Sequence, residues 1–359
     1  MTIKTDTEAF ESWLHTQCKA VGRDLEQKHK RMTDNAFMFL RATFYRWARK
    51  VEKICPELCD APAVLSVGDI HSENFGTWRD EEGRLVWGVN DFDEASVIPY
   101  AFDLVRLATS LRLAAGVPEA KFNMSGAQVA TILLGGYAAG LAEPRPTLLD
   151  DHMSWMREYV VMKDNKRAAF WHEFDDEKKF PGATPPEAVA DDLRASLPEG
   201  AQVERFTSVQ KGGGSLGRPR YLAIARWRGG RIVREAKALV PSAWDWAHKN
   251  EGAAIRFADL ATGRFRAPDP FLTIRHHFIV RRIAADSRKI DLDKLSGSGL
   301  DSKLIDAMGR DLAAVHAATD GAPASIHKDL GKRPATWLHD AAKTAAAAVT
   351  EDYTKWVNG

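Results

Sequence analysis

Two polar loops joined by a predicted hairpin constrain the fold of this chain more than any other feature of its sequence. The apolar run at residues 64–67 ends at Gly68, which predicts a buried strand that stops at a turn. Residues 75–78 and 85–89 are typical of strands, and the polar, glycine-containing segment between them predicts a hairpin loop. The hairpin connects two loops whose acidic and amide side chains are Asp69, Asn74, Asp91 and Asp93.

Asp69 and Asn74 have the Asp-x-x-x-x-Asn spacing of a phosphotransfer loop. In such a loop the Asp accepts or orients the proton of the attacking hydroxyl group, and the Asn amide oxygen ligates magnesium. Mg²⁺ prefers oxygen ligands, of which one or two are carboxylates. The predicted roles are catalytic base for Asp69 and metal ligation for Asn74, Asp91 and Asp93. The alternative is an ordinary turn at Gly68 and Asp69, with Asp91 and Asp93 as solvated loop acids.

Three motifs in this region carry a resemblance to known families. Gly68-Asp69-x-His71-x-x-Asn74, Asp91-Phe92 and Phe102-Asp-Leu-Val-Arg-Leu107 resemble the catalytic core of aminoglycoside phosphotransferase-like and choline-kinase-like enzymes. More closely, Gly-Asp-x-His-x-x-Asn-Phe-Gly, Asn-Asp-Phe-Asp-Glu and Asp-Leu-x-Arg-Leu resemble the bacterial family DUF2252. On these motifs the chain is identified as a member of that family.

The resemblance implies an α+β, protein kinase-like fold of two lobes that uses ATP and Mg²⁺. It places His71 beside Asp69 among the catalytic residues, where His71 braces the loop rather than transferring protons. It also implies that Asp103 braces the catalytic loop. An intrahelical ion pair between Asp103 and Arg106, three residues further on, is the alternative for that carboxylate.

A glycine-rich segment late in the chain predicts the nucleotide-binding half. Residues 212–217 fit Gly-x-Gly-x-x-Gly, which occurs in both Rossmann domains and kinases. A dinucleotide fold requires a helix next, whereas strands are predicted at 220–227 and 232–239 with a tight turn between them. Backbone N–H groups of such a loop can close over phosphates, and Lys237 has the position of the lysine that binds the α- and β-phosphates. The alternative is a glycine hairpin of no function with a surface Lys237.

The predicted cofactor-binding residues are Gly212, Gly213, Gly214, Ser215, Gly217, Lys237 and Glu251. Glu251 lies on a helix predicted at 243–261 and is the best candidate to pair with Lys237. Asp245 and Asp259 are the other candidates, and Glu235 is too near in sequence. A strand is predicted at 271–282, on which His276 and His277 point to opposite faces. It leads to residues 286–289, a hinge whose backbone would hydrogen-bond adenine.

The two halves of the resemblance occur in reversed order. The segment Leu312-Ala-Ala-Val-His316 ends a helix predicted at 301–318, and it is similar to the helix that precedes the catalytic loop in phosphotransferases. A circular permutation explains this order. The predicted parts are a helical catalytic lobe (1–175), a connector (176–202), an antiparallel-sheet lobe with the glycine loop (203–285) and helices that return to the catalytic lobe (286–359).

Helical periodicity and capping residues predict the remaining elements. The predicted helices cover residues 7–31, 36–51, 100–115, 125–141, 152–169, 186–197 and 332–357. The helix at 125–141 is rich in alanine and glycine and is therefore expected to pack closely against a neighbour.

Composition narrows the function classes. A net charge of +1 gives no basic excess for nucleic-acid binding, and no run of 18 apolar residues predicts a membrane span. The N-terminal residues lack an apolar signal core, and three cysteines suit a reducing cytoplasm. The expected partners are a nucleotide and an unknown, small-molecule acceptor.

The leading hypothesis is an ATP- and Mg²⁺-dependent phosphotransferase that acts on a hydroxyl group. A second hypothesis keeps the fold but makes the chain a nucleotide-binding pseudokinase or an enzyme that transfers AMP. A third is a metal-dependent hydrolase in which Asp69, His71, Asp91 and Asp93 surround a transition metal.

Overall fold

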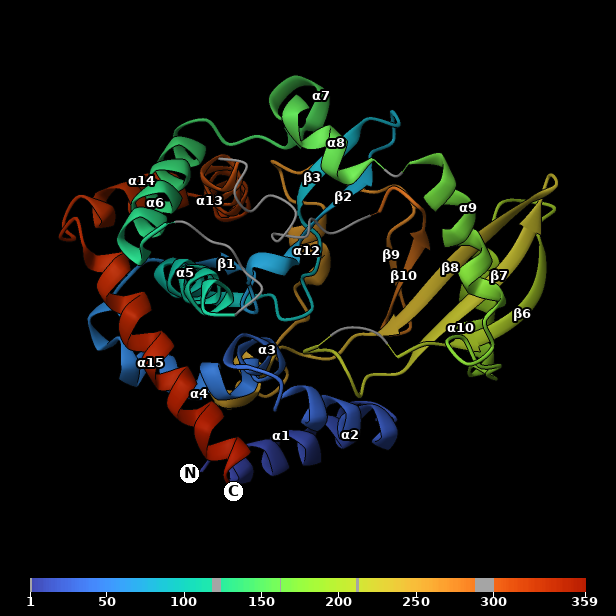
Figure 1. The fold of residues 1–359 in the computed structure, drawn as a ribbon, viewed down its shortest axis with the longest axis horizontal. Helices are drawn as coiled ribbons and strands as arrows, with labels where there is room; N and C mark the ends of the chain where they lie inside the picture. Colours follow the sequence, from blue (N-terminus) through green and yellow to red (C-terminus); the bar gives the residue numbers. More distant parts are fainter. Residues whose placement is uncertain (1, 118–123, 162, 211–212, 288–299) are drawn as a thin grey trace.

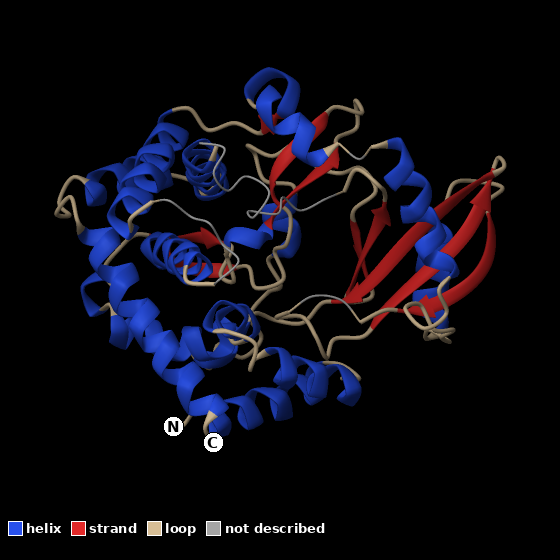
Figure 2. Cartoon of the chain, in the orientation of Figure 1, coloured by secondary structure: helices blue, strands red, loops and turns tan. Residues whose placement is uncertain are grey.

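Helices and a five-stranded sheet occupy two sides of the molecule in the computed structural model (Figures 1 and 2). The structure describes residues 2–117, 124–161, 163–210, 213–287 and 300–359. The chain is α+β, and its strands pair antiparallel in three sheets. The two chain ends lie side by side, where Lys4 Nζ donates to the carbonyl of Gly359.

Four helices open the chain where two were predicted. They are α1 (Ile3–Gln17), α2 (Gly22–Arg31), α3 (Ala36–Ala42) and α4 (Phe44–Ile54). The helix predicted at 7–31 is broken because Val21 is extended and donates its N–H to the carbonyl of Gly217, 2.9 Å away. The helix predicted at 36–51 is interrupted at Thr43, a β-branched residue with non-helical dihedral angles.

The predicted strands around the two polar loops are confirmed. Strand β1 (Ala63–Ser66) pairs antiparallel with β4 (Ser96–Pro99), which brings the first loop beside the second. Strands β2 (Phe75–Arg79) and β3 (Leu85–Val89) form the hairpin between the loops, and β5 (Thr147–Leu148) adds a third strand. The 3₁₀ turn η2 (Ser72–Asn74) leads directly into β2.

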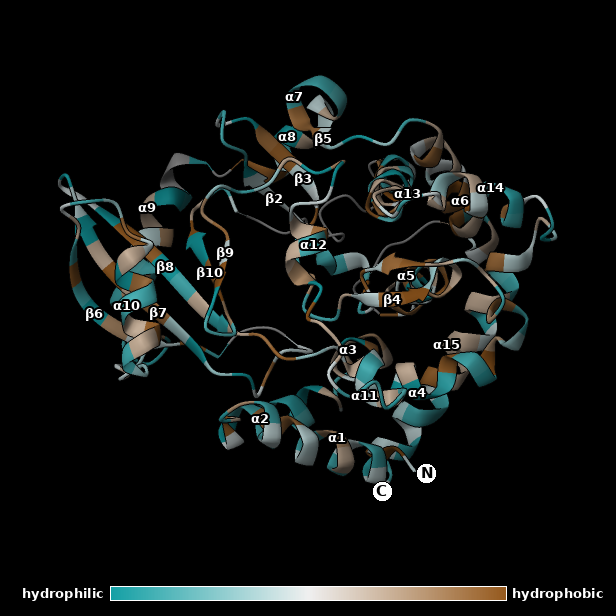
Figure 3. Cartoon of the chain, turned by 180° about the vertical axis from the view of Figure 1, so that it is seen from behind, coloured by the Kyte–Doolittle hydropathy of each residue, from teal (hydrophilic) through white to brown (hydrophobic). Residues whose placement is uncertain are grey.

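Five long or medium helices form the core of the helical side. They are α5 (Tyr100–Ala115), α6 (Gly126–Ala142), α13 (Asp301–Ala317), α14 (Ala322–Leu330) and α15 (Trp337–Val357). Hydrophobic residues gather on α5 and on β4 (Figure 3), and residues 100–111 of α5 are buried. The predicted bounds of α5 are confirmed, and α6 begins at a capping box made by Ser125 and Gln128.

Close packing of α6, expected from its small residues, is confirmed against α13. A Cβ atom on Gly309 would lie 2.4 Å from the carbonyl oxygen of Leu133, and one on Gly136 would lie 2.2 Å from that of Asp306. The two backbones therefore touch at a distance that no other residue permits. Trp337–Val357 (α15) then covers α5, so the C-terminal helices complete the core started by the N-terminal half.

The five-stranded sheet has the strand order β6-β7-β8-β10-β9. Its strands are β6 (Gln202–Ser208), β7 (Arg220–Trp227), β8 (Gly230–Ala238), β9 (Thr273–Arg275) and β10 (Phe278–Ile283). Helix α10 (Glu187–Ala195), close to its predicted bounds, packs Leu193 on Ala223 and Ala236. Phe174 and Phe180 pack on Leu222, Ile224 and Val233, which alternate with the first set and so lie on the other face.

Three predicted elements are wrong. Residues 271–282 form a hairpin, since His276 and His277 have φ of 45° and 61° and make the turn between β9 and β10. The helix predicted at 243–261 is two short helices, α11 (Ala243–Ala247) and α12 (Phe257–Ala261), separated by a turn in which Gly252 has φ of +77°. The helix predicted at 152–169 is divided into shorter helices because the backbone is not helical at Met153 and Val161. These pieces are α7 (Leu149–His152), α8 (Arg157–Val160) and α9 (Asp164–His172).

Candidate functional site

The two polar loops and the glycine-rich segment meet at one small cavity of about 50 Å³. Its lining residues come from segments more than 100 positions apart in the chain. They are Arg41, Asp69, His71, Asn74, Asp91, Asp93, Glu94, Gly213, Gly214, Ser215 and Arg218. Most of the predicted site residues are therefore neighbours in space.

Asp69 presents one carboxylate oxygen to this cavity and binds an arginine with the other. Its Oδ1 accepts from Nε of Arg106 at 3.1 Å and also from Nη2 of that residue. The fully buried Arg106 guanidinium lies over the rings of Phe44 and Trp47, at 4.9 and 5.1 Å from their centroids. A Cβ on Gly214 would be 3.0 Å from Asp69 Oδ2, so the glycine-rich segment lies directly over the free oxygen.

The environment of Asp69 keeps this carboxyl group near its titration point at neutral pH. Burial raises the pKa of Asp69 to about 7, with Arg106 opposing the rise and the charge of Glu94 adding to it. A carboxylate in this range can accept a proton far more effectively than an exposed one.

Asp103 braces the first polar loop from α5, and it makes no ion pair with Arg106. Its two oxygens accept the backbone N–H groups of Val67 at 2.8 Å and Gly68 at 3.0 Å. His316, at the end of α13, lies 3.1 Å from Asp103 through Nε2 and binds Tyr137 through Nδ1. Arg106 is instead turned toward Asp69, so the alternative of an intrahelical pair is wrong.

Replacing Asp103 by alanine should lower the free energy of unfolding by about 3 kcal/mol, because two buried N–H groups lose a charged acceptor. Asp306→Ala is the matched control, since Asp306 pairs with Arg310 on the surface of α13 and should cost less than about 1 kcal/mol. Urea unfolding followed by circular dichroism measures both. Equal losses in the two variants would show that the brace does not stabilise the loop.

Asn74 and His71 are held by the backbone of the same loop. The Asn74 amide nitrogen donates to the carbonyl of Asp69 at 2.8 Å, which directs the nitrogen away from metal ligation. His71 Nδ1 accepts the N–H of Glu73 at 3.2 Å, at the start of η2. Both side chains are buried and line the small cavity.

Lys237 spans the two acidic residues of the second loop. Its Nζ lies 2.7 Å from Asp93 Oδ1 and 3.4 Å from Asp91 Oδ1. Arg218 binds the other oxygen of Asp93 at 3.2 Å and also binds Glu94. Burial raises the pKa of Asp93, and the charge of Asp91 adds to the rise. Asp91 is the more accessible acid, with 34% of its side chain exposed against 8% for Asp93.

The predicted pairing of Glu251 with Lys237 is wrong. Glu251 is exposed in the turn between α11 and α12, because the helix that was to carry it does not form. The other two candidates are also engaged elsewhere, with Asp245 bound to Ser96 and Asp259 to Arg256.

The glycine-rich segment contributes unequally to the cavity. Gly213, Gly214 and Ser215 line it, whereas Gly212 lies outside the described residues. Gly217 faces the N-terminal helices instead, where a Cβ would lie 2.4 Å from Leu25. Its φ of +100° is one that residues with side chains rarely adopt, so this glycine shapes the backbone rather than lining the site.

A larger cleft of about 540 Å³ adjoins the small cavity and shares Asp91 and Ser215 with it. Its charged lining residues include Arg220, Lys237 and Arg281, together with Glu173, Arg266, Asp269 and Arg282. Its apolar lining residues include Phe92, Phe257, Leu272, Ile283, Ala284 and Ala285. Ile283 ends β10, and residues 284–285 lead from it to the predicted hinge, of which Asp286 and Ser287 are described and residues 288–289 lie outside the described part.

The donor atoms suit a magnesium ion that brings phosphate oxygens with it. Within residues 2–117, 124–161, 163–210, 213–287 and 300–359, no three His, Cys, Asp or Glu side chains are gathered to hold a metal alone. Asn74 and Asp91 line one cavity and supply the amide and carboxylate oxygens that Mg²⁺ accepts beside phosphates. A transition-metal site of Asp69, His71, Asp91 and Asp93 is not supported, since these described side chains are not gathered as a metal-holding group.

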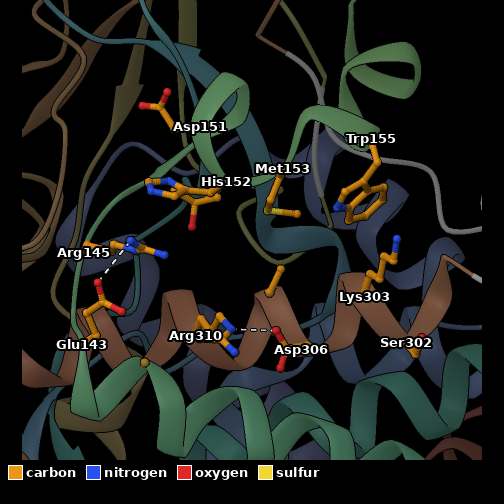
Figure 4. A pocket seen from close by; sticks show the side chains of 13 residues that line it. Glu143, Arg145, Asp151, His152, Met153, Trp155, Ser302, Lys303, Asp306 and Arg310 are labelled. Atoms are coloured by element: carbon orange, nitrogen blue, oxygen red, sulfur yellow. Dashed lines mark hydrogen bonds and ion pairs between the residues drawn. The ribbon is translucent and has the colours of Figure 1, made fainter.

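A third cavity, of about 640 Å³, lies between α6, the segment 143–155 and α13 (Figure 4). Its charged side chains partly satisfy one another, as Arg145 pairs with Glu143 at 3.2 Å and Arg310 with Asp306 at 2.7 Å. None of the predicted site residues lines this cavity. No helix in the described part of the chain has the length and apolar character needed to cross a membrane.

The charged residues of the site that were missed from the sequence include Arg41, Glu94, Arg218, Arg220 and Arg281. Two of them could have been found, because Arg218 and Arg220 directly follow the last glycine of the glycine-rich segment. Basic side chains at the end of such a loop are well placed to reach the same anionic group as the loop backbone. Arg41 carries no comparable indication, since it lies on α3 far away in the chain.

One family model matches almost the whole chain. It is described as "Uncharacterized protein conserved in bacteria (DUF2252)" and matches residues 21–171 and 184–359. No curated protein and no solved structure shows significant similarity.

Proposed function

The chain belongs to the DUF2252 family, and from the geometry of its site we propose that it is an ATP- and Mg²⁺-dependent phosphotransferase acting on a hydroxyl group. The observation that carries the proposal is the pair of joined cavities. A cleft large enough for a nucleotide is lined by Lys237 and Asp91, and the small cavity that adjoins it is lined by Asp91 and Asp69.

In the proposed reaction, the acceptor hydroxyl oxygen attacks the γ-phosphorus of ATP. The bond from that phosphorus to the bridging oxygen breaks, ADP leaves, and the hydroxyl proton passes to Asp69 Oδ2. Arg106 fixes the other oxygen of Asp69, which orients the base. The backbone of residues 213–215 and the Lys237 ammonium group would hold the phosphates in position. When bound, Mg²⁺ would be held by Asn74 and Asp91 and would neutralise phosphate charge.

We propose the same two-lobed, protein kinase-like arrangement in permuted order that the motifs suggested. The sheet supports it, because the glycine-rich segment enters β7 and Lys237 lies on the next strand, β8. The helical side supports it through Asp69 and Asn74 on the first loop and Asp103 on α5. The acceptor is proposed to be a small molecule.

Calorimetric titration with Mg²⁺ and a non-hydrolysable ATP analogue tests the proposal. We expect saturable binding with one site per chain. Mass spectrometry after incubation with ATP and candidate acceptors then distinguishes a gain of phosphate from a gain of AMP. Absence of nucleotide binding would overturn the proposal. Binding without any product would favour a pseudokinase, and a product that gains AMP would favour nucleotidyl transfer.

The pH dependence of turnover should reveal the base. Because burial raises the pKa of Asp69 to about 7, kcat/KM should fall as the pH decreases through 7, where the carboxylate becomes protonated and can no longer accept a proton. Initial rates of ADP release between pH 5.5 and 9 measure this limb. A profile that stays flat down to pH 5.5 would contradict the role of Asp69.

A further inference from the structure

Three cations and one carboxylate cluster on the sheet face that lines the large cleft. The antiparallel register places Arg220 of β7 opposite Lys237 of β8, and Arg281 of β10 opposite Glu235 of β8. Glu235 and Lys237 are two residues apart on one strand, so their side chains lie on the same face. The three cations line the cleft, and Glu235 is buried behind them with 1% of its surface exposed.

Glu235 binds both arginines at once. Its Oε1 accepts from Nη1 of Arg220 at 2.9 Å, and its Oε2 accepts from Nε of Arg281 at 2.7 Å. Arg220 also donates from Nη2 to Ser215 Oγ at 3.3 Å, which ties the glycine-rich segment to the same cluster. The Glu235 carboxylate therefore fixes two guanidinium groups, one from each of the strands that flank β8. The side-chain entropy of the two arginines is lost on folding rather than on binding.

The three cations of this cluster are matched by three carboxylates, but the cations line the cleft whereas Glu235 is buried. A single buried carboxylate balances one arginine, yet it is shared between two, and Lys237 stands on the same face. The carboxylates of Asp91 and Asp93, on the second polar loop, pair with Lys237. Arg220 and Arg281 pair with Glu235 instead. Two guanidinium groups and one ammonium group that line a nucleotide-sized cleft suit a polyphosphate, because planar guanidinium groups offer paired donors to its oxygens.

We infer that Glu235 is the positioning residue of the nucleotide site and that the arginines it orients, Arg220 and Arg281, bind the polyphosphate chain together with Lys237. The inference rests on the proposed function and extends it to the residues that hold the phosphates of the nucleoside triphosphate. Glu251 was expected to orient Lys237 from a helix. Glu235 instead orients two arginines from the sheet.

Calorimetry on the Glu235→Gln variant tests this role. Affinity for the Mg²⁺-bound, non-hydrolysable ATP analogue should fall roughly tenfold or more, because two charge-assisted hydrogen bonds that orient the arginines are weakened. Affinity for adenosine, measured by displacement, should change less than about threefold, since adenosine has no phosphates. A merely structural role of Glu235 would weaken both ligands alike.

Glu204→Gln is the matched control, because Glu204 pairs with Arg226 at 2.6 Å on the same sheet, outside the cleft. It should leave both affinities unchanged. If Glu235→Gln does not fold, Arg281→Met keeps Glu235 paired with Arg220 and should give the same selective loss, which Arg281→Lys should partly restore. Native protein that binds no nucleotide would overturn the proposed function and this inference together. Native binding that persists unchanged in Glu235→Gln and Arg281→Met would overturn the role of Glu235 alone.

Discussion

Replacing Asp69 by asparagine should reduce turnover by about 10² or more while leaving nucleotide affinity nearly unchanged. The variant has the same shape but cannot accept the proton of an attacking hydroxyl group. Arg106 keeps a polar partner through the amide oxygen, so the loop should stay in place. The initial rate of ADP release, with an acceptor or with water in its place, measures the first effect. Calorimetry with the ATP analogue measures the second.

Asp306→Asn controls for the chemical change at Asp69. Asp306 makes a surface pair with Arg310, 2.7 Å away, and lies outside both joined cavities. Its turnover should equal that of the native protein. If Asp69→Asn retains near-native turnover, Asp69 is not the base. Its Oδ2 atom beside Gly214 would then not accept a proton in the reaction.

Replacing Asp91 by alanine should abolish the Mg²⁺-dependent part of nucleotide binding, with a loss of affinity of roughly 10² or more. Asp91 is the accessible acid of the second loop, while Asp93 is buried between Lys237 and Arg218. Asp93 therefore cannot replace it without breaking two ion pairs. The loss should fall on the metal-dependent part because the phosphates would keep their protein donors.

Calorimetric titrations of the native protein and Asp91→Ala, each with Mg²⁺ and with EDTA, separate the two contributions. In EDTA the two proteins should bind the ATP analogue with similar affinity. Asp60→Ala is a suitable control, because this carboxylate is 84% exposed and remote from both cavities. Equal affinities of native and Asp91→Ala protein in Mg²⁺ would exclude Asp91 as a metal ligand.

Local chemistry explains which elements could be predicted. The bounds of α5 and β7 were predicted correctly, since an apolar period and flanking turn residues define each of them within the segment itself. The hairpin 271–283 and the broken helix at 243–261 could not be predicted in the same way. Their turns depend on left-handed backbone at His276, His277 and Lys249, which those residue types rarely adopt.

The residues of the candidate site likewise could be predicted where they depend on local spacing, but their ion pairs could not. Spacing along the chain was enough to select Asp69, Asn74 and Asp91, because the roles proposed for them depend on a loop of fixed length and on the hairpin that follows it. The side chains that pair with these residues could not be predicted from the sequence. Arg106 could face Asp103 or Asp69 from the same helix, and only the packing of α5 beside the first polar loop decides for Asp69.

By itself, the sequence determined the α+β composition, the family, the two loops and the glycine-rich segment with Lys237, since each depends on motifs or periodic patterns within local segments of the chain. The tertiary structure alone decided that Lys237 lies against Asp91 and Asp93 and that Glu235 binds two arginines from neighbouring strands. The physical reason is that ion pairs between distant segments depend on strand register and burial. These are properties of the folded chain and not of any one segment.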